Sequence, residues 1–600
     1  MISRRSQRIR KPKVIWEAAE DPTPPDQKKT TEKASRIVKK EALTPIPVEP
    51  IPASIPRELP SYNPPIKISR KQGKPRFESL SELQTFQKFF TKTIIQLVII
   101  ATNSYAARKR SNSDLLHTRT WKDTTIGEIY RYIGIWLYMG MHREAVRATF
   151  WSPTHQLGQY LSYDRFEQIH RYFSTRDEAT SPRQQGETFA WKIEPIATFL
   201  RQNILMNWSP GTHLAVDEAM IAFRGRTNHK VKMKNKPIDE RYKTWMIAEN
   251  GYTIAWLWHS KVEGPEGIPN KEGIPVSETI SSTGYLSPTF AIVIHLARIL
   301  CTAYPNKNYH FFLNNLFLNV NVALALLELG ILCTGTTRKN AAGVPNWLVE
   351  LKIKNRSLIW NSTFAEIVNG VLYFLWQDNN AVLGITTGFD LSQRVLRMRK
   401  RPSLTSTNAR IVYPIFRDEI HKRLWIPKVI DEYNHHMNSV DLANQLRATM
   451  TTNRPQEHRI WHPLWHFCVD IVAVNSYICW RYGRPSRQRK QRQFRQRLVD
   501  ALLSYPLDSE AYAATPQAVD RWSGHSWTRF DKRSYCVWCT ARPKIRSKAR
   551  RQILGDITNQ AISTVRIRPK RTHGGCEKCQ TPLCASGTCF RKYHSYIESN

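Results

Sequence analysis

Asp217 is the residue whose type and position first suggest chemistry. It lies inside the segment 213–223, whose largely apolar sequence predicts a β-strand. Aspartate is depleted in strands, so an aspartate at this position needs a reason. Carboxylate oxygens are the ligands that Mg²⁺ and other hard divalent cations take, and a metal-dependent site is therefore the functional interpretation. An incidental aspartate on an edge strand is the alternative.

Cysteines near the end of the sequence indicate a second kind of metal site. Six of the ten cysteines follow residue 535, and two CxxC pairs have the spacing used for tetrahedral Zn²⁺. Two structural zinc ions need eight ligands. We expect these to be Cys536, Cys539, Cys576, Cys579, Cys584, Cys589, His594 and His525, with His573 as the rival for the eighth place. Thiols that bind no metal are the alternative.

The elements expected around Asp217 follow a defined order. The strand 213–223 precedes strands 243–249 and 252–260, which flank Asn250-Gly251, a dipeptide typical of a type I′ hairpin. A helix from Ser287-Pro288, a strand at 309–313, a helix at 319–329 and a strand at 331–336 follow. This βββ-α-β-α-β order is that of the ribonuclease-H-like fold, an α/β architecture, with its last helix at 438–450.

Enzymes with this fold hold two Mg²⁺ ions that activate the attacking oxygen and stabilise the leaving oxygen of a phosphodiester. The ligands come from the first strand, the end of the fourth strand and the last helix. These positions are Asp217, residue 314 and Asp441. Asp441 alone is a weak indication, because an aspartate is also favourable at an ordinary helix N-terminus.

Several motifs resemble those of piggyBac-type transposases and transposon-derived proteins. They are Val216-Asp217-Glu218, 223–226 (FRGR), 235–237 (NKP), 312–317 (FLNNLF), 433–441 and the Cys-rich end. The resemblance runs from about residue 80 to 595. It implies cut-and-paste transposition, usually at TTAA sites, by an aspartate triad with a fourth aspartate three residues after the third. It also implies a RING-like Cys-rich domain with two zinc ions and a helical domain for dimerisation and DNA binding.

Two positions depart from the family pattern. Asn314 aligns with the second catalytic aspartate and Asn444 with the fourth. No aspartate occurs between Asp239 and Asp378, so no replacement carboxylate is visible nearby. An amide oxygen can ligate Mg²⁺, but it brings no charge and cannot bridge two ions. We therefore expect strand transfer to be impaired or absent, with Mg²⁺ at the aspartate site only if the protein is active. An error at one codon is the alternative for Asn314.

The expected domains follow from shifts in composition and pattern. The proline-rich, basic residues 1–78 predict a disordered tail. The rest divides into a helical domain, 79–205; a ribonuclease-H-like core, 206–344, with its last helix at 429–450; a β-rich insertion, 345–428; a returning helical domain, 451–515; and the zinc-binding domain, 522–595.

The formal net charge of +40 favours a polyanionic partner, and double-stranded DNA is the first expectation. Candidate phosphate-binding residues are Arg224, Arg226, Lys232, Lys234, Lys236, Arg454 and Arg459; a solvated basic loop is the alternative for those beyond the first strand. His435 and His436 are interpreted as orienting or packing residues, with metal binding as the alternative. No long apolar run or signal peptide is visible, so we expect a nuclear protein, a homodimer by resemblance, with no membrane partner.

The preferred hypothesis is a nuclear, transposon-derived DNA-binding protein with an impaired active site. The second is an active transposase that tolerates Asn314. The third is an interaction protein built on the zinc module, such as a chromatin reader or a RING-type ubiquitin ligase, which would not bind duplex DNA tightly.

Overall fold

The structure is a computed structural model. It describes residues 56, 58–111, 120–184, 187–232, 240–260, 264–265, 274–275, 285–353, 358–403, 409–454, 457, 459–485, 490–507, 527–535, 571–576 and 581–582. The chain divides into two compact units. The core unit comprises Met1–Gln72, Gly211–Asp217 and Gly267–Ser439, and the helical unit comprises Gly73–Pro210, Glu218–Glu266 and Val440–Asn600. Strand β3 (His213–Ala222) begins in the core unit and ends in the helical unit.

Three parallel strands form the centre of the core unit. β10 (Tyr309–Leu313) lies between β3 and β11 (Ile331–Thr336). Every residue of β10 is buried, as expected for a strand inside a sheet whose faces are covered. Helices α6 (Pro288–Ala303) and α7 (Val320–Glu328) make the crossover connections. Asn319 caps α7 through its side chain, and Gly330, with a positive φ of 71°, ends it before β11.

The segment predicted as a β-rich insertion continues the core sheet. Its strands β12 (Thr363–Val368), β13 (Val371–Gln377) and β14 (Ala381–Thr386) form an antiparallel meander, and β14 pairs with the edge strand β11. A separate hairpin of β15 (Arg394–Lys400) and β16 (His421–Pro427) follows. Helices α8 (Asn346–Ile353), α9 (Ala409–Phe416) and α10 (Lys428–His436) complete the unit. The apolar side chains of these strands pack with Val429 and Ile430 of α10 in one cluster.

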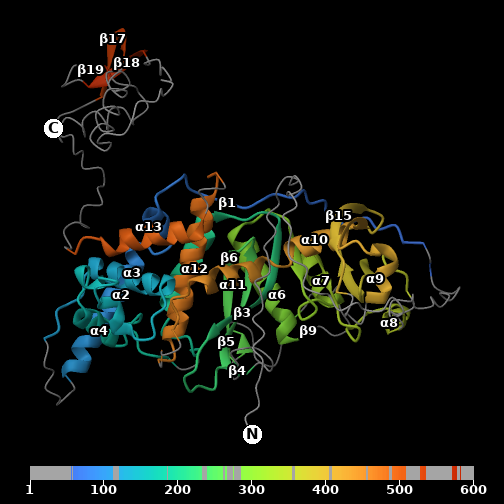
Figure 1. The fold of residues 1–600 in the computed structure, drawn as a ribbon, viewed down its shortest axis with the longest axis horizontal. Coiled ribbons are helices and arrows are strands. Elements are labelled where there is room, and N and C mark those ends of the chain that lie inside the picture. The colour runs from blue at the N-terminus through green and yellow to red at the C-terminus, as the bar shows by residue number, and fades with distance from the viewer. Residues whose placement is uncertain are drawn as a thin grey trace. The chain divides into compact units, whose positions relative to one another are not determined.

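The helical unit contains helices from both ends of the described chain. α1 (Glu82–Gln87), α2 (Lys92–Ser111), α3 (Ile126–Met141), α4 (Tyr163–Tyr172) and α5 (Glu194–Asn207) come first, with short 3₁₀ turns at Arg147–Trp151 and Leu157–Gln159. α11 (Ser439–Thr449), α12 (His462–Arg481) and α13 (Gln491–Leu503) return to them. In Figure 1 the orange α12 and α13 lie among the blue and cyan helices. α12 is buried along almost its whole length, which explains why its apolar residues extend around the helix.

The remaining strands of the helical unit extend β3. The hairpin β5 (Glu240–Glu249) and β6 (Tyr252–Ser260) turns at Asn250 and Gly251, whose positive φ values of 47° and 89° fit the predicted type I′ turn. The short strands β4 (Val231–Lys232) and β7 (Gly264–Pro265) pair with β5 and β6. The hydrogen-bonded order around β3 is therefore β6-β5-β3-β10-β11. The element order βββ-α-β-α-β predicted over 213–336 is present.

Short strands complete the described residues. β1 (Lys74–Pro75) pairs with β2 (Trp208–Ser209), and β8 (Ile274–Pro275) pairs with β9 (Tyr285–Leu286). Towards the end of the chain, β17 (Trp527–Tyr535), β18 (Arg571–Cys576) and β19 (Thr581–Pro582) form a small antiparallel sheet. No helix within the described residues is long and apolar enough to cross a membrane.

Candidate active site

Asp217, in the middle of β3, and Asn314, which directly follows β10, lie side by side. Val216 of β3 pairs with Leu313 of β10, so the next residue of each strand, Asp217 and Asn314, continues this register. The Asn314 amide nitrogen Nδ2 donates a hydrogen bond of 2.9 Å to Oδ1 of Asp217. Both side chains are half-buried. The structure thus brings together two of the three positions that the sequence assigned to catalysis.

The orientation of the Asn314 amide is fixed by both of its partners. Its oxygen Oδ1 accepts a hydrogen bond of 2.8 Å from the backbone N–H of Leu316, while Nδ2 donates to Asp217. If the amide oxygen and nitrogen were exchanged, the NH₂ group would face the N–H of Leu316, and the amide oxygen would face the carboxylate of Asp217. Asn314 therefore presents hydrogens to the carboxylate, and its oxygen is turned into its own loop.

Tyr433 on α10 is a third polar group near Asp217 that sequence reasoning missed. Its hydroxyl lies 3.5 Å from Oγ1 of Thr336 at the end of β11. Burial raises the pKa of the Tyr433 phenol, the hydrogen bond with Thr336 opposes this, and the nearby Asp217 carboxylate raises the pKa further. The phenol stays protonated near neutral pH and can act as a hydrogen-bond donor. The family motif at 433–441 includes Tyr433, but the sequence alone gave this residue no role.

Asp441 lies in the helical unit, exposed in the first turn of α11. One turn further, the Asn444 amide donates a hydrogen bond of 3.3 Å to the Glu218 carbonyl oxygen. Its Oδ1 accepts a hydrogen bond of 3.3 Å from the guanidinium of Arg447. Like Asn314, Asn444 is thus held at both ends of its amide.

Glu218 is the carboxylate nearest to Asp217 in the sequence. Successive side chains of a strand point to opposite faces, so its carboxylate does not share the face of Asp217. It forms an ion pair of 2.9 Å with Lys243. Glu218 is therefore no replacement for the missing aspartate.

Arg224 and Arg226, predicted to bind DNA, are exposed beyond the end of β3. The buried ring of Phe223 anchors this turn, and a Cβ on Gly225 would lie 2.2 Å from that ring. Only glycine fits between the two arginines without moving the ring. Lys232 is placed in β4 by its backbone alone, and Lys234 and Lys236 lie outside the described residues.

Arg454 and Arg459, the other predicted DNA-binding residues, make contacts within the helical unit. The Arg454 guanidinium donates to the carbonyl oxygen of Glu144. That of Arg459 donates 2.8 Å hydrogen bonds to the carbonyl oxygens of His170 and Arg171 at the end of α4. These bonds use donors that a phosphate contact would need, and a DNA role for the two residues stays a prediction.

The predicted zinc ligands fall almost entirely outside the described residues. These are Cys536, Cys539, Cys579, Cys584, Cys589, His594 and His525. Cys576 is buried at the end of β18, and His573 lies on the same strand. The ligand set remains a prediction.

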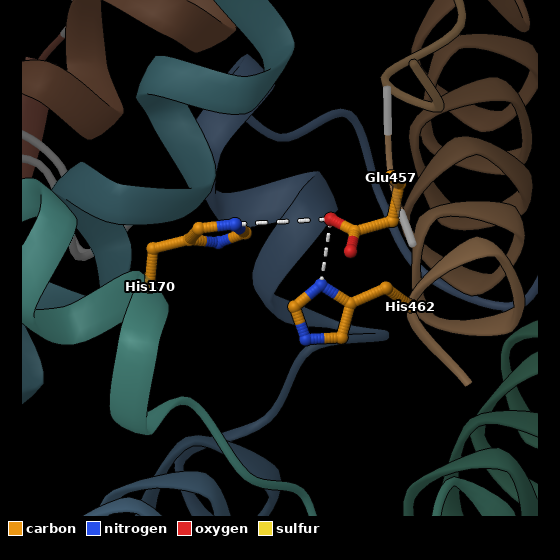
Figure 2. A group of neighbouring side chains, drawn as sticks. All are labelled: His170, Glu457 and His462. Carbon is orange, nitrogen blue, oxygen red and sulfur yellow. Dashed lines mark hydrogen bonds and ion pairs between the residues drawn. The ribbon is translucent and has the colours of Figure 1, made fainter. Parts of the chain in front are cut away.

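A buried network in the helical unit joins His170, Glu457 and His462 (Figure 2). Oε2 of Glu457 lies 2.9 Å from Nδ1 of His462 and 3.7 Å from Nε2 of His170. Arg459 donates to Nε2 of His462, so the proton of that ring sits on Nδ1 and is donated to Glu457. Burial lowers the pKa of His170 to about 2, and hydrogen bonding to His462 helps to hold the pKa of Glu457 well below its usual range.

Comparison with known proteins identifies the family of the chain. A family model described as Transposase IS4 matches residues 81–477, about two thirds of the sequence, and the chain belongs to this transposase family. It is similar to piggyBac transposable element-derived protein 3 of Homo sapiens, with 24% identity over 411 residues, 66% of this chain and 60% of that protein. The human chimeric ERCC6-PGBD3 protein matches with the same 24% identity over 34% of its length. The chain spans less than two thirds of either relative.

A solved structure supports the fold. The chain is similar to a piggyBac transposase determined by cryo-EM in a synaptic complex with hairpin DNA, with a TM-score of 0.56 and 20% identity. The match covers 87% of this chain and 100% of that chain. The piggyBac resemblance predicted from the sequence is confirmed.

Proposed function

We propose that this chain is a nuclear, transposon-derived protein that binds double-stranded DNA but cleaves it poorly or not at all. Its core would be ribonuclease-H-like, with Asp217, residue 314 and Asp441 at the catalytic positions. The observation that carries this proposal is the hydrogen bond of 2.9 Å from the Asn314 amide to Asp217.

The residues present do not fit a pair of Mg²⁺ ions. Mg²⁺ requires nearly ideal octahedral oxygen coordination, and two closely spaced ions need bridging carboxylate charge. Here the NH₂ group of Asn314 faces Asp217, and its oxygen accepts from the backbone of Leu316. Turning the amide toward a metal would break both hydrogen bonds and would supply no negative charge. Loss of one member of a catalytic unit commonly costs several orders of magnitude in rate.

DNA binding does not depend on the lost carboxylate. The net charge is +40, and Arg224 and Arg226 extend into solvent from a turn anchored by Phe223. Guanidinium groups on a fixed turn can contact successive phosphates without reading base sequence. The solved piggyBac transposase of similar fold is bound to hairpin DNA, which makes transposon ends and TTAA sites the first DNA targets to test. Homodimerisation and two zinc ions in the Cys-rich segment belong to the same proposal.

Cleavage and binding should be measured on the same purified protein with the same DNA. In a gel-shift assay, the unmodified protein is expected to bind an end-labelled duplex that carries candidate terminal repeats. It is not expected to nick this duplex in Mg²⁺ or Mn²⁺. Affinity should fall steeply with salt, because each neutralised phosphate releases counterions. The variant Arg224→Gln/Arg226→Gln should bind more weakly and show a shallower salt dependence.

Asn314→Asp and the double variant Asn314→Asp/Asn444→Asp test the lost chemistry directly. If the two amides are the only obstacle, the double variant should nick DNA in a metal-dependent manner. Robust nicking by the unmodified protein would refute the impaired active site, whereas absence of duplex binding at low salt would refute the DNA-binding function. In the second case ubiquitin transfer and histone-peptide binding become the activities to measure.

A further inference from the structure

A second cluster of metal-ligating side chains lies in the core unit. His213 at the start of β3 and Glu432 and His436 on α10 bring one potential ligand atom each within 4.8 Å of one another. Only 8% of His213 and 3% of His436 is exposed. Glu432 and His436 are four residues apart on one helix, so their side chains project from the same face. Two imidazoles and a carboxylate therefore converge in a largely dry site.

Three buried polar atoms of Glu432 and His436 have no well-directed hydrogen bond. Neither ring nitrogen of His436 has a hydrogen-bond partner, and Oε2 of Glu432 has none. Burying such groups without a well-directed hydrogen bond is unfavourable. Nε2 of His436 and Oε2 of Glu432 are 3.3 Å apart without the geometry of a hydrogen bond. That separation matches the ~3.3 Å edge of a zinc tetrahedron whose bonds are about 2.0–2.1 Å long.

The second imidazole of the cluster, that of His213, is oriented by its neighbour Thr212. Nδ1 of His213 lies 2.9 Å from the Thr212 hydroxyl oxygen. That oxygen also accepts from the backbone N–H of Lys71 at 2.9 Å and can donate its proton to the carbonyl oxygen of Ser69 at 3.3 Å. This pattern is satisfied when His213 carries its proton on Nδ1, which leaves the lone pair on Nε2 for the cluster. A hydrogen bond to the second nitrogen is how metal-binding histidines are commonly held.

The network around Glu457 has the same composition as the cluster on α10 but different hydrogen bonding. In Figure 2 the Glu457 carboxylate lies between two imidazoles, joined to both by dashed lines. There the Arg459 guanidinium is hydrogen-bonded to Nε2 of His462, and the Tyr132 hydroxyl is hydrogen-bonded to Nδ1 of His170. The guanidinium also opposes any added cation. In the cluster on α10, by contrast, His436 has no such partner on either nitrogen.

We propose that His213, Glu432 and His436 bind one zinc-class transition-metal ion that holds α10 against β3. Two imidazoles and one carboxylate suit Zn²⁺ better than Mg²⁺, and a water molecule can fill the fourth position. Because α10 also carries Tyr433 and β3 carries Asp217, the ion would fix the helix beside the candidate active site. This structural ion is distinct from the zinc of the Cys-rich segment and does not depend on DNA binding.

Metal stoichiometry of the full-length protein tests this site. Metal-free protein would be titrated with Zn²⁺ against a chromophoric chelator, and the number of tightly bound equivalents counted. Glu432→Gln and His436→Gln are each expected to bind one equivalent fewer than the unmodified protein. His435→Gln is the matched control, because His435 is the adjacent histidine on α10 and its side chain is 48% exposed. It should keep the full number of equivalents.

Substitution with Co²⁺ separates this site from thiolate sites. Co²⁺ bound to cysteine shows a thiolate charge-transfer band, which a site of two imidazoles and a carboxylate lacks. The unmodified protein should bind one equivalent of Co²⁺ in addition to those that produce this band. This measurement does not require that the variants fold. The proposal is overturned if all bound Co²⁺ is accounted for by thiolate sites. It is likewise overturned if folded Glu432→Gln and His436→Gln, checked by circular dichroism, retain the full number of equivalents.

Discussion

The substitution Asn314→Asp, which introduces the carboxylate that the family pattern predicts here, should make the stability of the protein dependent on divalent cations. The substitution replaces a charge-assisted hydrogen bond of 2.9 Å with two facing carboxylates. The lost bond is worth about 1.5–3 kcal/mol. Two full charges at this distance would repel by about 6 kcal/mol at an effective dielectric constant of 20. The pair can avoid part of this by binding a proton, which at pH 7 costs a carboxyl group about 4 kcal/mol.

The shared proton restores a hydrogen bond of the same kind, so the cost of protonation sets the expected destabilisation of Asn314→Asp at about 4 kcal/mol at pH 7 in EDTA. The shared proton raises the pKa of the paired carboxyl groups in the folded state, so the folded variant binds more protons than the unfolded one. Its stability should therefore recover as the pH falls from 7 towards 5. Mg²⁺ should also restore stability, because the cation replaces repulsion with attraction.

Thermal unfolding followed by tryptophan fluorescence, in EDTA and in Mg²⁺, measures these effects. Asn315→Asp is the matched control, since it adds the same charge one residue away on an exposed side chain. Only Asn314→Asp should show a lowered midpoint that rises with Mg²⁺ or acid. If Asn314→Asp were as stable as the unmodified protein in EDTA, or if Mg²⁺ stabilised both variants equally, the reasoning from the amide orientation would be refuted.

Three further predictions concern the scaffold. Arg165→Met should destabilise the helical unit by about 3 kcal/mol, because it leaves the Glu128 carboxylate, 14% exposed and 2.7 Å from the guanidinium, without its partner; chemical denaturation measures this. Gly335→Ala should cost more than 3 kcal/mol, since the added Cβ would lie 1.9 Å from the Leu313 carbonyl oxygen. The helical unit should lose stability below pH 6.5, because burial lowers the pKa of His170 to about 2 and only the unfolded chain then gains the proton.

Each of these has a control in the same chain. Gly370→Ala meets no atom within 4 Å, so its cost should be limited to the strain of a positive φ. A charge-retaining Arg165→Lys should lose less stability than Arg165→Met. For the acid effect, His170→Phe should flatten the fall of stability between pH 6.5 and 5, and an unchanged slope would contradict the assignment to His170. The low pKa of Glu457 acts in the same direction, but mainly below pH 4.5.

The order and bounds of the elements along the chain near the site were predictable, because the sequence signals that specify them are local. Strands 252–260, 309–313 and 331–336 were predicted at the bounds that the structure shows. Asn250-Gly251 specifies a hairpin through the φ values that the two residues can adopt, and Gly330 ends α7 for the same reason. The capping box of Thr125 and Glu128, also predicted, depends on residues three positions apart. Such signals act before any tertiary contact forms.

Partners distant in the sequence could not be predicted in this way. The pattern of 363–386 indicates strands, but nothing in it specifies that β14 pairs with β11 and extends the core sheet. The cluster of His213 with Glu432 and His436 joins residues more than 200 positions apart, and only the spacing of Glu432 and His436 is visible locally. Likewise the sequence shows that residue 314 is an asparagine, whereas its orientation depends on Asp217 and on the N–H of Leu316.

The asparagines at two positions predicted to be catalytic, Asn314 and Asn444, change what the folded chain requires from solution. An aspartate set that binds Mg²⁺ repels itself when the ions are absent, and part of the folding free energy is then conditional on metal. Asn314 donates to Asp217, and Asn444 bridges the Glu218 carbonyl oxygen and Arg447. Each amide donates a hydrogen bond to a neighbouring oxygen, and a carboxylate at the same position would repel that oxygen or leave it without a donor. We infer that these substitutions exchange catalytic charge for stability without metal, in the direction expected of a stability–activity trade-off. If so, the unmodified protein should unfold at the same temperature with or without Mg²⁺, and the aspartate variants should not.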